Sequence, residues 1–227
     1  MPITDILLVV AKQPIPGHTK SRLCPPLTPA QAADLYDCFL RDTLDLMRKV
    51  PDVQRMIGYL PEEAKGYFGQ LAPDMDLTIQ RGESLGERLD HLLSEVLAGG
   101  SQRAVVMDSD SPTLPESYLS EAFKRLNEVD VVLGPTHDGG YYLIGLKQPQ
   151  PHLLRQVQMS TSHVLRDTLA LAEASGLSVT LLPTWYDVDT IADLYKLDSE
   201  IAKMSVNGRA AATSRWLAKS GWRNRKE

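Results

Sequence analysis

The sequence predicts an α/β fold with a mostly parallel β-sheet covered by helices on both faces. Short apolar segments alternate along the chain with longer amphipathic segments of helical period. Several apolar segments are continuously apolar, as in strands that helices cover on both faces. Polar clusters follow several of these segments, where open α/β sheets bind their ligands. The three observations together indicate alternating strand and helix units.

The strand candidates are 5–11, 53–60, 76–80, 103–108, 129–135, 140–146 and 177–182. The first long helix begins after Thr28, with Pro29 at its first position and Gln31 placed for a capping box, and runs to about Lys49. Further helical patterns cover 61–71, 84–98, 115–127, 161–175 and 190–203. Gly134 and Pro135 interrupt the parallel pattern, so the following GGYYLIGL is a candidate antiparallel strand.

A chain of 227 residues with 43% hydrophobic residues is long enough for one domain with a sizeable core. We assign residues 1–204 to this domain and residues 205–227 to a basic C-terminal helix or tail. The tail holds six Lys and Arg residues against one acid, together with Trp216 and Trp222. It is either a solvated helix that docks its tryptophans on the body or a surface for an anionic partner.

Charge and cysteine usage narrow the class of protein. The net charge of −5 argues against nucleic acid as the main partner. Cys24 and Cys38 have no metal or redox spacing, which is typical of free thiols in a reducing cytoplasm. The sequence shows neither a signal peptide nor a membrane span, so we expect a cytoplasmic protein of undetermined oligomeric state.

The segment AKQPIPGHTKSRLCPP, residues 11–26, follows the first strand candidate and carries Lys12, Lys20 and Arg22. No acid occurs between Asp5 and Asp34, and three fixed cations suit a diphosphate or triphosphate. The segment is neither a Walker A sequence nor a GxGxxG fingerprint. The alternative interpretation is a solvated basic loop.

Asp108 and Asp110 follow the apolar strand candidate 103–108 directly. In an extended segment they share a face, where they repel each other by about 1 kcal/mol in water and by more when partly buried. A divalent cation such as Mg²⁺ or Mn²⁺ would relieve this repulsion and bridge the carboxylates to substrate phosphates. Alternatively, Asp110 or Ser111 caps the helix that begins near Pro115.

Three further segments are candidates. In YDVDTIADL, Asp187 and Asp189 repeat the D-x-D spacing, and Asp189 is either a third metal ligand or, like Thr190, a helix cap. In THDGGYYLIG, Asp138 is a candidate general base, substrate ligand or turn residue beside two glycines. In QRGESLGERL, small residues precede a helix and leave room for a planar base.

These segments, with MDSDSPTLPESYL, GPTHDGGYYLIGL and MSTSHVLRDTL, resemble the ordered motifs of a bacterial transferase family. That family, the rSAM/selenodomain-associated transferase 1 family, is also described as arsenosugar-biosynthesis glycosyltransferase-like. It belongs to the GT-A, or nucleotide-diphospho-sugar transferase, superfamily, with relatives that include guanylyltransferases. The resemblance spans about residues 5–203 and implies a single-domain, Rossmann-like GT-A fold.

The resemblance also implies roles for particular residues. Nucleotide binding would involve Lys12, Lys20 and Arg22 at the phosphates and Gln80, Gly82 and Ser84 near the base. The metal ligands for Mg²⁺ or Mn²⁺ would be Asp108, Asp110 and Asp189. The acceptor side would hold the catalytic Asp138 together with Gly139 and Gly140.

The leading hypothesis is therefore a metal-dependent transferase that moves a sugar from a nucleotide sugar to a small-molecule acceptor. A second hypothesis is nucleotidyl transfer, in which a phosphorylated acceptor attacks a nucleoside triphosphate and pyrophosphate leaves. A third is a nucleotide-binding module without turnover. A haloacid-dehalogenase-type phosphatase also uses D-x-D after a strand, but there the motif follows the first strand rather than the fourth.

Overall fold

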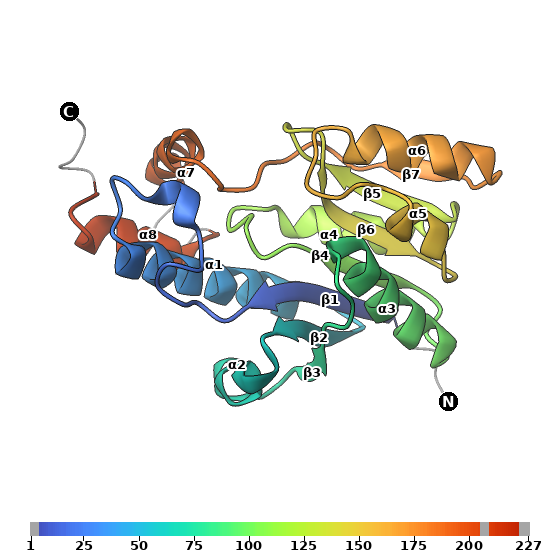
Figure 1. Ribbon diagram of the computed structural model, residues 1–227, viewed down its shortest axis with the longest axis horizontal. Helices are drawn as coiled ribbons and strands as arrows, with labels where there is room; N and C mark the ends of the chain where they lie inside the picture. Colours follow the sequence, from blue (N-terminus) through green and yellow to red (C-terminus); the bar gives the residue numbers. More distant parts are fainter. Residues whose placement is uncertain (1–4, 205–208, 223–227) are drawn as a thin grey trace.

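One β-sheet runs through the computed structural model of the chain, which describes residues 5–204 and 209–222 (Figure 1). Within these residues its strands are β1 (Asp5–Lys12), β2 (Val53–Leu60), β3 (Asp76–Ile79), β4 (Ala104–Met107), β5 (Val131–Pro135), β6 (Tyr141–Leu146) and β7 (Val179–Leu181). They lie in the order β3-β2-β1-β4-β6-β5-β7. Only β6 runs antiparallel to its neighbours in this sheet, β4 and β5. The predicted fold class, a mostly parallel mixed α/β sheet in one domain, is confirmed, and so is the antiparallel strand.

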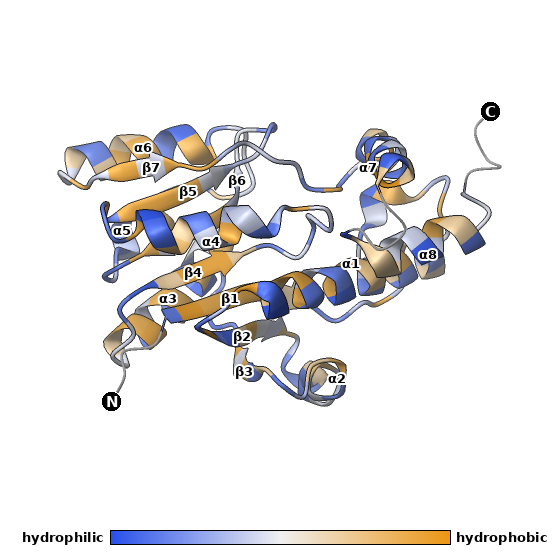
Figure 2. Cartoon of the chain, turned by 180° about the vertical axis from the view of Figure 1, so that it is seen from behind, coloured by the Kyte–Doolittle hydropathy of each residue, from blue (hydrophilic) through white to orange (hydrophobic). Residues whose placement is uncertain are grey.

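Helices cover both faces of the sheet (Figures 1 and 2). On one face lie α3 (Leu85–Ala98), α5 (Pro151–Arg155) and α6 (Val164–Ala174). On the other face lie α1 (Pro29–Lys49), α2 (Lys65–Leu71) and α4 (Glu116–Arg125). Helices α7 (Ile191–Lys203) and α8 (Ala211–Lys219) lie beyond the ends of the strands in Figure 1, and α8 packs on α1. Two single turns, η1 (Ser21–Leu23) and η2 (Glu62–Ala64), complete the described helical elements.

The alternation of β1 divides the core between these two layers. Leu7 and Val9 pack with the α1 layer, whereas Ile6 and Leu8 pack with the α3 layer. Successive residues of a strand point to opposite faces, so an uninterrupted apolar run is required where both faces are covered. A leucine buried in this way contributes about 1.5–3 kcal/mol. Strands β1, β4 and β5 are accordingly coloured mainly as hydrophobic in Figure 2.

The ends of the elements follow local signals in the sequence. Thr28 and Gln31 form the predicted capping box at the start of α1, with Pro29 as its first residue. The observed strands agree with the predicted ones to within two residues at each end. The short helices η1 and α5 were not predicted, because each contributes only about one turn of helical pattern.

The described part of the C-terminal segment packs on the body. Helix α8 lies against α1, and the backbone N–H groups of Ala212 and Thr213 at its start each donate to the Asp42 carboxylate at 2.8 Å. Trp222 is 1% exposed. Residues 205–208 and 223–227, including the basic residues Arg223, Arg225 and Lys226, lie outside the described residues.

None of the described helices combines the length and the apolar character needed to cross a bilayer.

Candidate active site

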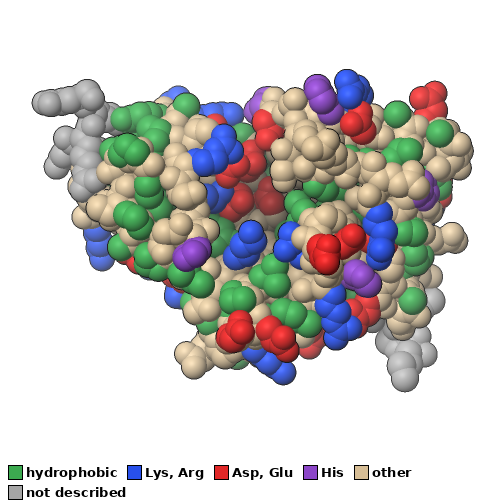
Figure 3. Space-filling model, viewed as in Figure 1, with side chains coloured by type: hydrophobic (Ala, Val, Ile, Leu, Met, Phe, Trp, Pro, Cys, Tyr) green, Lys and Arg blue, Asp and Glu red, His purple; other side chains and the backbone are tan. Residues whose placement is uncertain are grey.

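A cleft opens where β1 and β4 end, and it consists of two connected lobes. The first, of about 430 Å³, includes Lys12, His18, Lys20, Tyr36 and Arg88 in its lining, and we call it the cationic lobe. The second, of about 390 Å³, includes Thr136, Asp138, Gly140, Tyr141 and Asp187, and we call it the acidic lobe. Both lobes are lined by Val10, Arg22, Leu85, Asp108, Asp110, Ser160 and Asp189. Figure 3 shows the hollow, with acidic side chains inside it and Lys and Arg side chains beside it.

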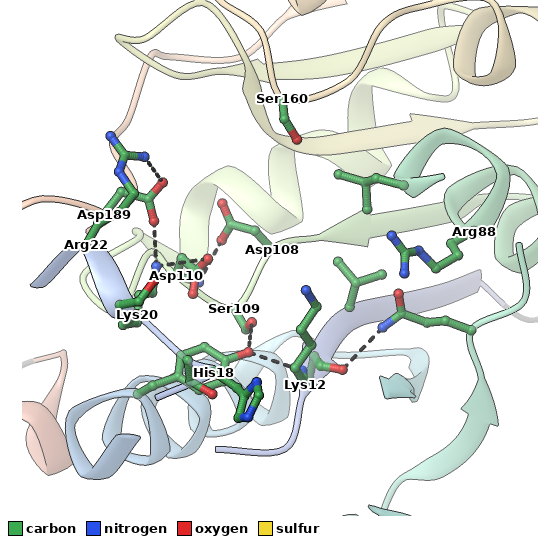
Figure 4. A pocket seen from close by; sticks show the side chains of 17 residues that line it. Lys12, His18, Lys20, Arg22, Arg88, Asp108, Ser109, Asp110, Ser160 and Asp189 are labelled. Atoms are coloured by element: carbon green, nitrogen blue, oxygen red, sulfur yellow. Dashed lines mark hydrogen bonds and ion pairs between the residues drawn. The ribbon is translucent and has the colours of Figure 1, made fainter. Parts of the chain in front are cut away.

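Lys20 joins the loop after β1 to two distant acids. Its side chain is 6% exposed, and its ammonium lies 3.1 Å from Asp110 Oδ2 and 2.7 Å from Asp189 Oδ1 (Figure 4). Burial lowers the pKa of the amine, but the two carboxylates outweigh it and hold that pKa above its usual value. Lys20 is therefore a fixed positive charge. It pairs with Asp110 and Asp189 and offsets only part of the D-x-D repulsion expected from the sequence, because it makes no ion pair with Asp108.

Arg22 extends the same ion-pair cluster towards solvent. Its Nη1 lies 3.2 Å from Asp189 Oδ2, and its side chain is 68% exposed. Burial raises the pKa of the Asp189 carboxyl, but Lys20 and Arg22 together bring that pKa below its usual value. The structure thus brings Lys20 and Arg22 of one predicted segment together with Asp189 of another.

Asp108 and Asp110 lie in a turn rather than in the strand. Strand β4 ends at Met107, and Asp108 Oδ1 accepts the backbone N–H of Asp110 at 3.2 Å. Asp108 Oδ2 accepts the Ser111 hydroxyl at 3.3 Å. The alternative that Asp110 or Ser111 caps the next helix is wrong, since the N-cap of α4 is Pro115, without a side-chain cap. Both aspartates line the cleft instead.

The carboxyl group of Asp108 has a pKa well above its usual range. Burial is the main cause, and the negative charges of Asp110 and Asp187 add to it. Burial also raises the pKa of Asp187 to about 6, with contributions from Asp189 and Asp138. The cleft therefore holds more carboxyl groups than Lys20 and Arg22 pair with, since neither cation pairs with Asp108 or Asp187.

The unpaired carboxyl groups of the cleft include candidates for the predicted metal site. Asp110 Oδ1 is buried and has no hydrogen-bond partner among the described residues, which suits a cation ligand. Asp189 faces Lys20 and Arg22 instead, and no three acidic, histidine or cysteine side chains within 5–204 and 209–222 are grouped to hold one ion. The donors present thus fit a cation on Asp108 and Asp110, with Asp189 outside that pair.

A buried hydrogen bond fixes the strand ends against α1. The Tyr36 hydroxyl lies 2.8 Å from Ser109 Oγ and also accepts the backbone N–H of Lys12 at 3.2 Å. Tyr36 is 5% exposed and Ser109 is 3% exposed. This contact holds the residue between the two aspartates in place. This contact was not predictable from the sequence, because Tyr36 occupies an ordinary buried position of an amphipathic helix.

The predicted base-binding residues divide into two groups. Gln80 lines the cationic lobe, and its Nε2 donates to the backbone oxygens of Ala11 and Gly58. Gly82 and Ser84 are absent from the described lining of either lobe. Ser84 caps α3, and Gly82 has a φ of +126°, where a Cβ would also lie 2.6 Å from Glu87 Cβ. These two residues shape the turn before α3.

Arg88 is a site residue that the sequence analysis missed. It lines the cationic lobe (Figure 4), and its Nε is buried without a hydrogen-bond partner among the described residues. It lies near the N-terminus of α3, where the helix dipole disfavours a cation unless an anion is near. An arginine in the first turn of a predicted helix is the sequence feature that could have pointed to an anion at this position.

The acidic lobe is built around the turn after β5. Asp138 Oδ1 accepts the Thr136 hydroxyl and the backbone N–H of Gly140, so the carboxylate is held in one orientation. Gly139 has a φ of +92°, and a Cβ there would lie 2.1 Å from the Ser162 carbonyl oxygen. Gly139 therefore lets the turn pack against residues 160–162, while Asp138 and Gly140 line the lobe. Asp187 faces the same lobe, although only Asp189 of that D-x-D was assigned a role.

The capping alternative in the last motif is correct for Thr190. Its hydroxyl accepts the backbone N–H of Asp193, and the Asp193 side chain accepts the backbone N–H of Thr190. Because Thr190 caps α7, the Asp189 carboxylate stays available for Lys20 and Arg22.

The chain is similar in sequence or fold to several known proteins. A protein of Desulfovibrio desulfuricans G20, provisionally described as a nucleotide-diphospho-sugar transferase, has 31% identity and a TM-score of 0.87, covering 94% of this chain and 95% of that one. The 2-phospho-L-lactate guanylyltransferase of Methanothermobacter thermautotrophicus is 28% identical over 181 residues, which is 78% of this chain and 77% of the relative. Rv0371c of Mycobacterium tuberculosis H37Rv in complex with manganese shares the fold at 19% identity, with a TM-score of 0.56 over 87% of this chain and 98% of that one.

These likenesses confirm the predicted transferase class and support the nucleotide-diphospho-sugar transferase superfamily. A family model described as "Uncharacterized protein conserved in bacteria (DUF2064)" matches residues 43–161. The chain is a transferase that belongs to this DUF2064 family.

Proposed function

We propose that the chain binds a nucleoside-diphosphate sugar across the two lobes and transfers the sugar to a small acceptor. The observation that carries this proposal is the division of charge along one continuous cleft. The cationic lobe offers Lys12 and Arg88 without carboxylate partners among the described residues, which suits a diphosphate. The acidic lobe offers carboxylates, which suit the hydroxyl groups of a sugar.

In the proposed reaction the acceptor oxygen forms a bond to the anomeric carbon of the sugar. The bond between that carbon and the diphosphate oxygen breaks, and the nucleoside diphosphate leaves with the electron pair. Lys12, Lys20 and Arg88 would stabilise the charge on the leaving diphosphate. Asp138, whose carboxylate is fixed by Thr136 and Gly140, would accept the proton of the acceptor hydroxyl.

Asp108 and Asp110 would hold Mg²⁺ or Mn²⁺ in this proposal. When bound, such an ion neutralises part of the charge on the diphosphate. The buried, unpartnered Asp110 Oδ1 supports this role. Lys20 would keep Asp189 and Asp110 from repelling each other and would hold the loop after β1 against them.

Nucleotidyl transfer is the second candidate. The basic loop and the 28% identity to a guanylyltransferase favour it. In that reaction a phosphorylated acceptor attacks the α-phosphate of a nucleoside triphosphate, and pyrophosphate leaves. A nucleotide-binding module without turnover would keep the same contacts and release neither product.

We place the chain among the transferases associated with radical-SAM and selenium-related gene sets, in the cytoplasm. Residues 1–204 would form the transferase domain, and residues 205–227 would be an appended helix and tail. Gln80 would contact the base, with Gly82 and Ser84 setting the course of the backbone beside it.

The test is product identification. The purified chain is incubated at pH 8 with a panel of nucleotide sugars or nucleoside triphosphates, a panel of small alcohols and of small phosphorylated compounds, and Mg²⁺ or Mn²⁺. Release of nucleoside diphosphate from a nucleotide sugar supports glycosyl transfer, and release of pyrophosphate from a triphosphate supports the second candidate. Nucleotide binding with neither product from any acceptor would reject both reactions and leave the binding module.

A further inference from the structure

The acidic lobe is poor in positive charge. Its described lining holds five acidic side chains, those of Asp108, Asp110, Asp138, Asp187 and Asp189. Arg22 is the one Lys, Arg or His side chain in that lining, and its guanidinium faces Asp189. Even with a divalent cation on Asp108 and Asp110, no cationic side chain of the described residues is paired with Asp138 or Asp187.

The floor of the same lobe is apolar. Val106, Ile144 and Leu89 line it and are at most 6% exposed. Tyr141 and Met159 add partly buried apolar surface. The hydroxyl-bearing residues 160–162 also line the lobe, in the segment against which Gly139 packs. The lining of the lobe thus combines apolar side chains with carboxylates and hydroxyls.

We infer that this lobe takes a neutral or positively charged hydroxyl compound with an apolar portion as its acceptor, and excludes phosphorylated acceptors. The inference rests on the proposed function only in treating the lobe as the acceptor site. A phosphate group placed there faces carboxylates at short range without a basic side chain to receive it, and such like-charge contacts are costly in a partly desolvated cleft. An ammonium group would instead be attracted by the same carboxylates. An alkyl portion would displace water from the apolar side chains that line the lobe.

Three matched probes test the inference: hexane-1,6-diol, 6-aminohexan-1-ol and 6-hydroxyhexyl phosphate. They share one carbon chain and one hydroxyl nucleophile, and they differ in the second end group. Their dissociation constants are measured by calorimetry or ligand-observed NMR on the full chain in the presence of a saturating nucleoside diphosphate, which keeps the phosphate probe out of the cationic lobe. The measurements are made at pH 8.

We expect the amino alcohol and the diol to bind at least about tenfold more tightly than the phosphate, since one unfavourable charge contact amounts to such a factor. In the Asp138→Asn, Asp187→Asn double variant the phosphate should gain affinity and the amino alcohol should lose it. Both substitutions keep the shape of the side chain. Asp45→Asn, which removes an exposed acid of α1 outside the cleft, is the matched control and should leave all three constants unchanged.

The phosphate probe binding as tightly as the diol overturns the inference, and so does the absence of saturable binding by both the diol and the amino alcohol. An order of affinities that the double variant leaves unchanged also overturns it, because the preference would then arise elsewhere. These outcomes are separate from failure of the proposed function. If no nucleoside diphosphate is released with any probe but the order of binding holds, the transfer reaction is wrong and the acceptor class of the lobe stands.

Discussion

The two lobes of the cleft lie side by side at the same edge of the sheet, yet their charges are opposite. The cationic lobe is formed mainly by the loop after β1 and the start of α3, which bring Lys12, Lys20 and Arg88. The acidic lobe is formed by the turn after β5 and the segment before α7, which bring Asp138 and Asp187. The strands supply a common floor, and the connecting loops determine which chemical groups each lobe accepts.

The boundary between the lobes explains how both charges coexist. Asp108, Asp110 and Asp189 line both lobes, and Lys20 reaches from the cationic side to bridge Asp110 and Asp189. This ion-pair cluster holds the first loop of the chain against a segment 169 residues later. The difference between the lobes therefore depends on a few side chains whose removal has separable effects.

The largest effect is expected at Lys20. Lys20→Met keeps most of the side-chain volume but leaves Asp110 and Asp189 facing each other without the ammonium. Removing one partner of a largely buried ion pair destabilises a protein by about 3 kcal/mol, less where the partners are partly exposed as here. Thermal and denaturant unfolding should show this loss, together with weaker binding of a nucleoside diphosphate.

Arg41→Met is the matched control for Lys20→Met. It removes an exposed ion pair with Asp37 on α1, which contributes about 0.2–1 kcal/mol at most. Equal stability losses in the two variants would contradict the bridging role of Lys20.

The next effect concerns the metal. Asp110→Ala should abolish the additional thermal stabilisation that Mn²⁺ gives in the presence of a nucleotide, because Asp110 Oδ1 is the buried oxygen without a partner. Melting temperatures are measured with nucleotide alone and with nucleotide plus Mn²⁺. An undiminished Mn²⁺ effect in Asp110→Ala would rule out this carboxylate as a ligand.

A smaller effect is expected at Arg88, which lines the cationic lobe and not the acidic lobe. Arg88→Leu should weaken the binding of a nucleoside diphosphate about tenfold, while the binding of the nucleoside stays within about twofold. The free energy of unfolding should hardly change, because the guanidinium has no ion-pair partner among the described residues. Equal losses for nucleoside and diphosphate would show that Arg88 does not face the phosphates.

The smallest effect lies outside both lobes. Asp42→Ala removes the cap of α8 and should cost about 1 kcal/mol of stability. Nucleotide affinity should not change, because Asp42 lines neither lobe in the described structure. A loss of nucleotide affinity in this variant, at a temperature where it remains folded, would mean that the docked helix communicates with the cleft.

Much of the fold was predictable from local patterns. The capping box at Thr28, the apolar run of β1 and the break at Gly134 each depend on neighbours in the sequence. The position of the site was also predictable, because polar segments at strand ends meet at one edge of a parallel sheet. The D-x-D motif and the basic loop therefore meet as expected.

The partners within the site were less predictable. Lys20 contacts Asp189 across 169 positions of sequence, a distance over which no periodic pattern carries information. Tyr36 and Arg88 belong to amphipathic helices, where the sequence gives the buried face but not the cavity that one side chain enters. Asp108 was expected in an extended strand, but β4 ends one residue earlier and its carboxylate turns back to the Asp110 backbone.

The most direct test of the account is a crystal structure of the chain with a nucleoside diphosphate and Mn²⁺. The account predicts that both phosphates lie in the cationic lobe, within hydrogen-bond distance of Lys12 or Arg88, with the acidic lobe left to the sugar and acceptor. Phosphates found beside Asp138 and Asp187 would contradict the division of the cleft on which the proposed function depends.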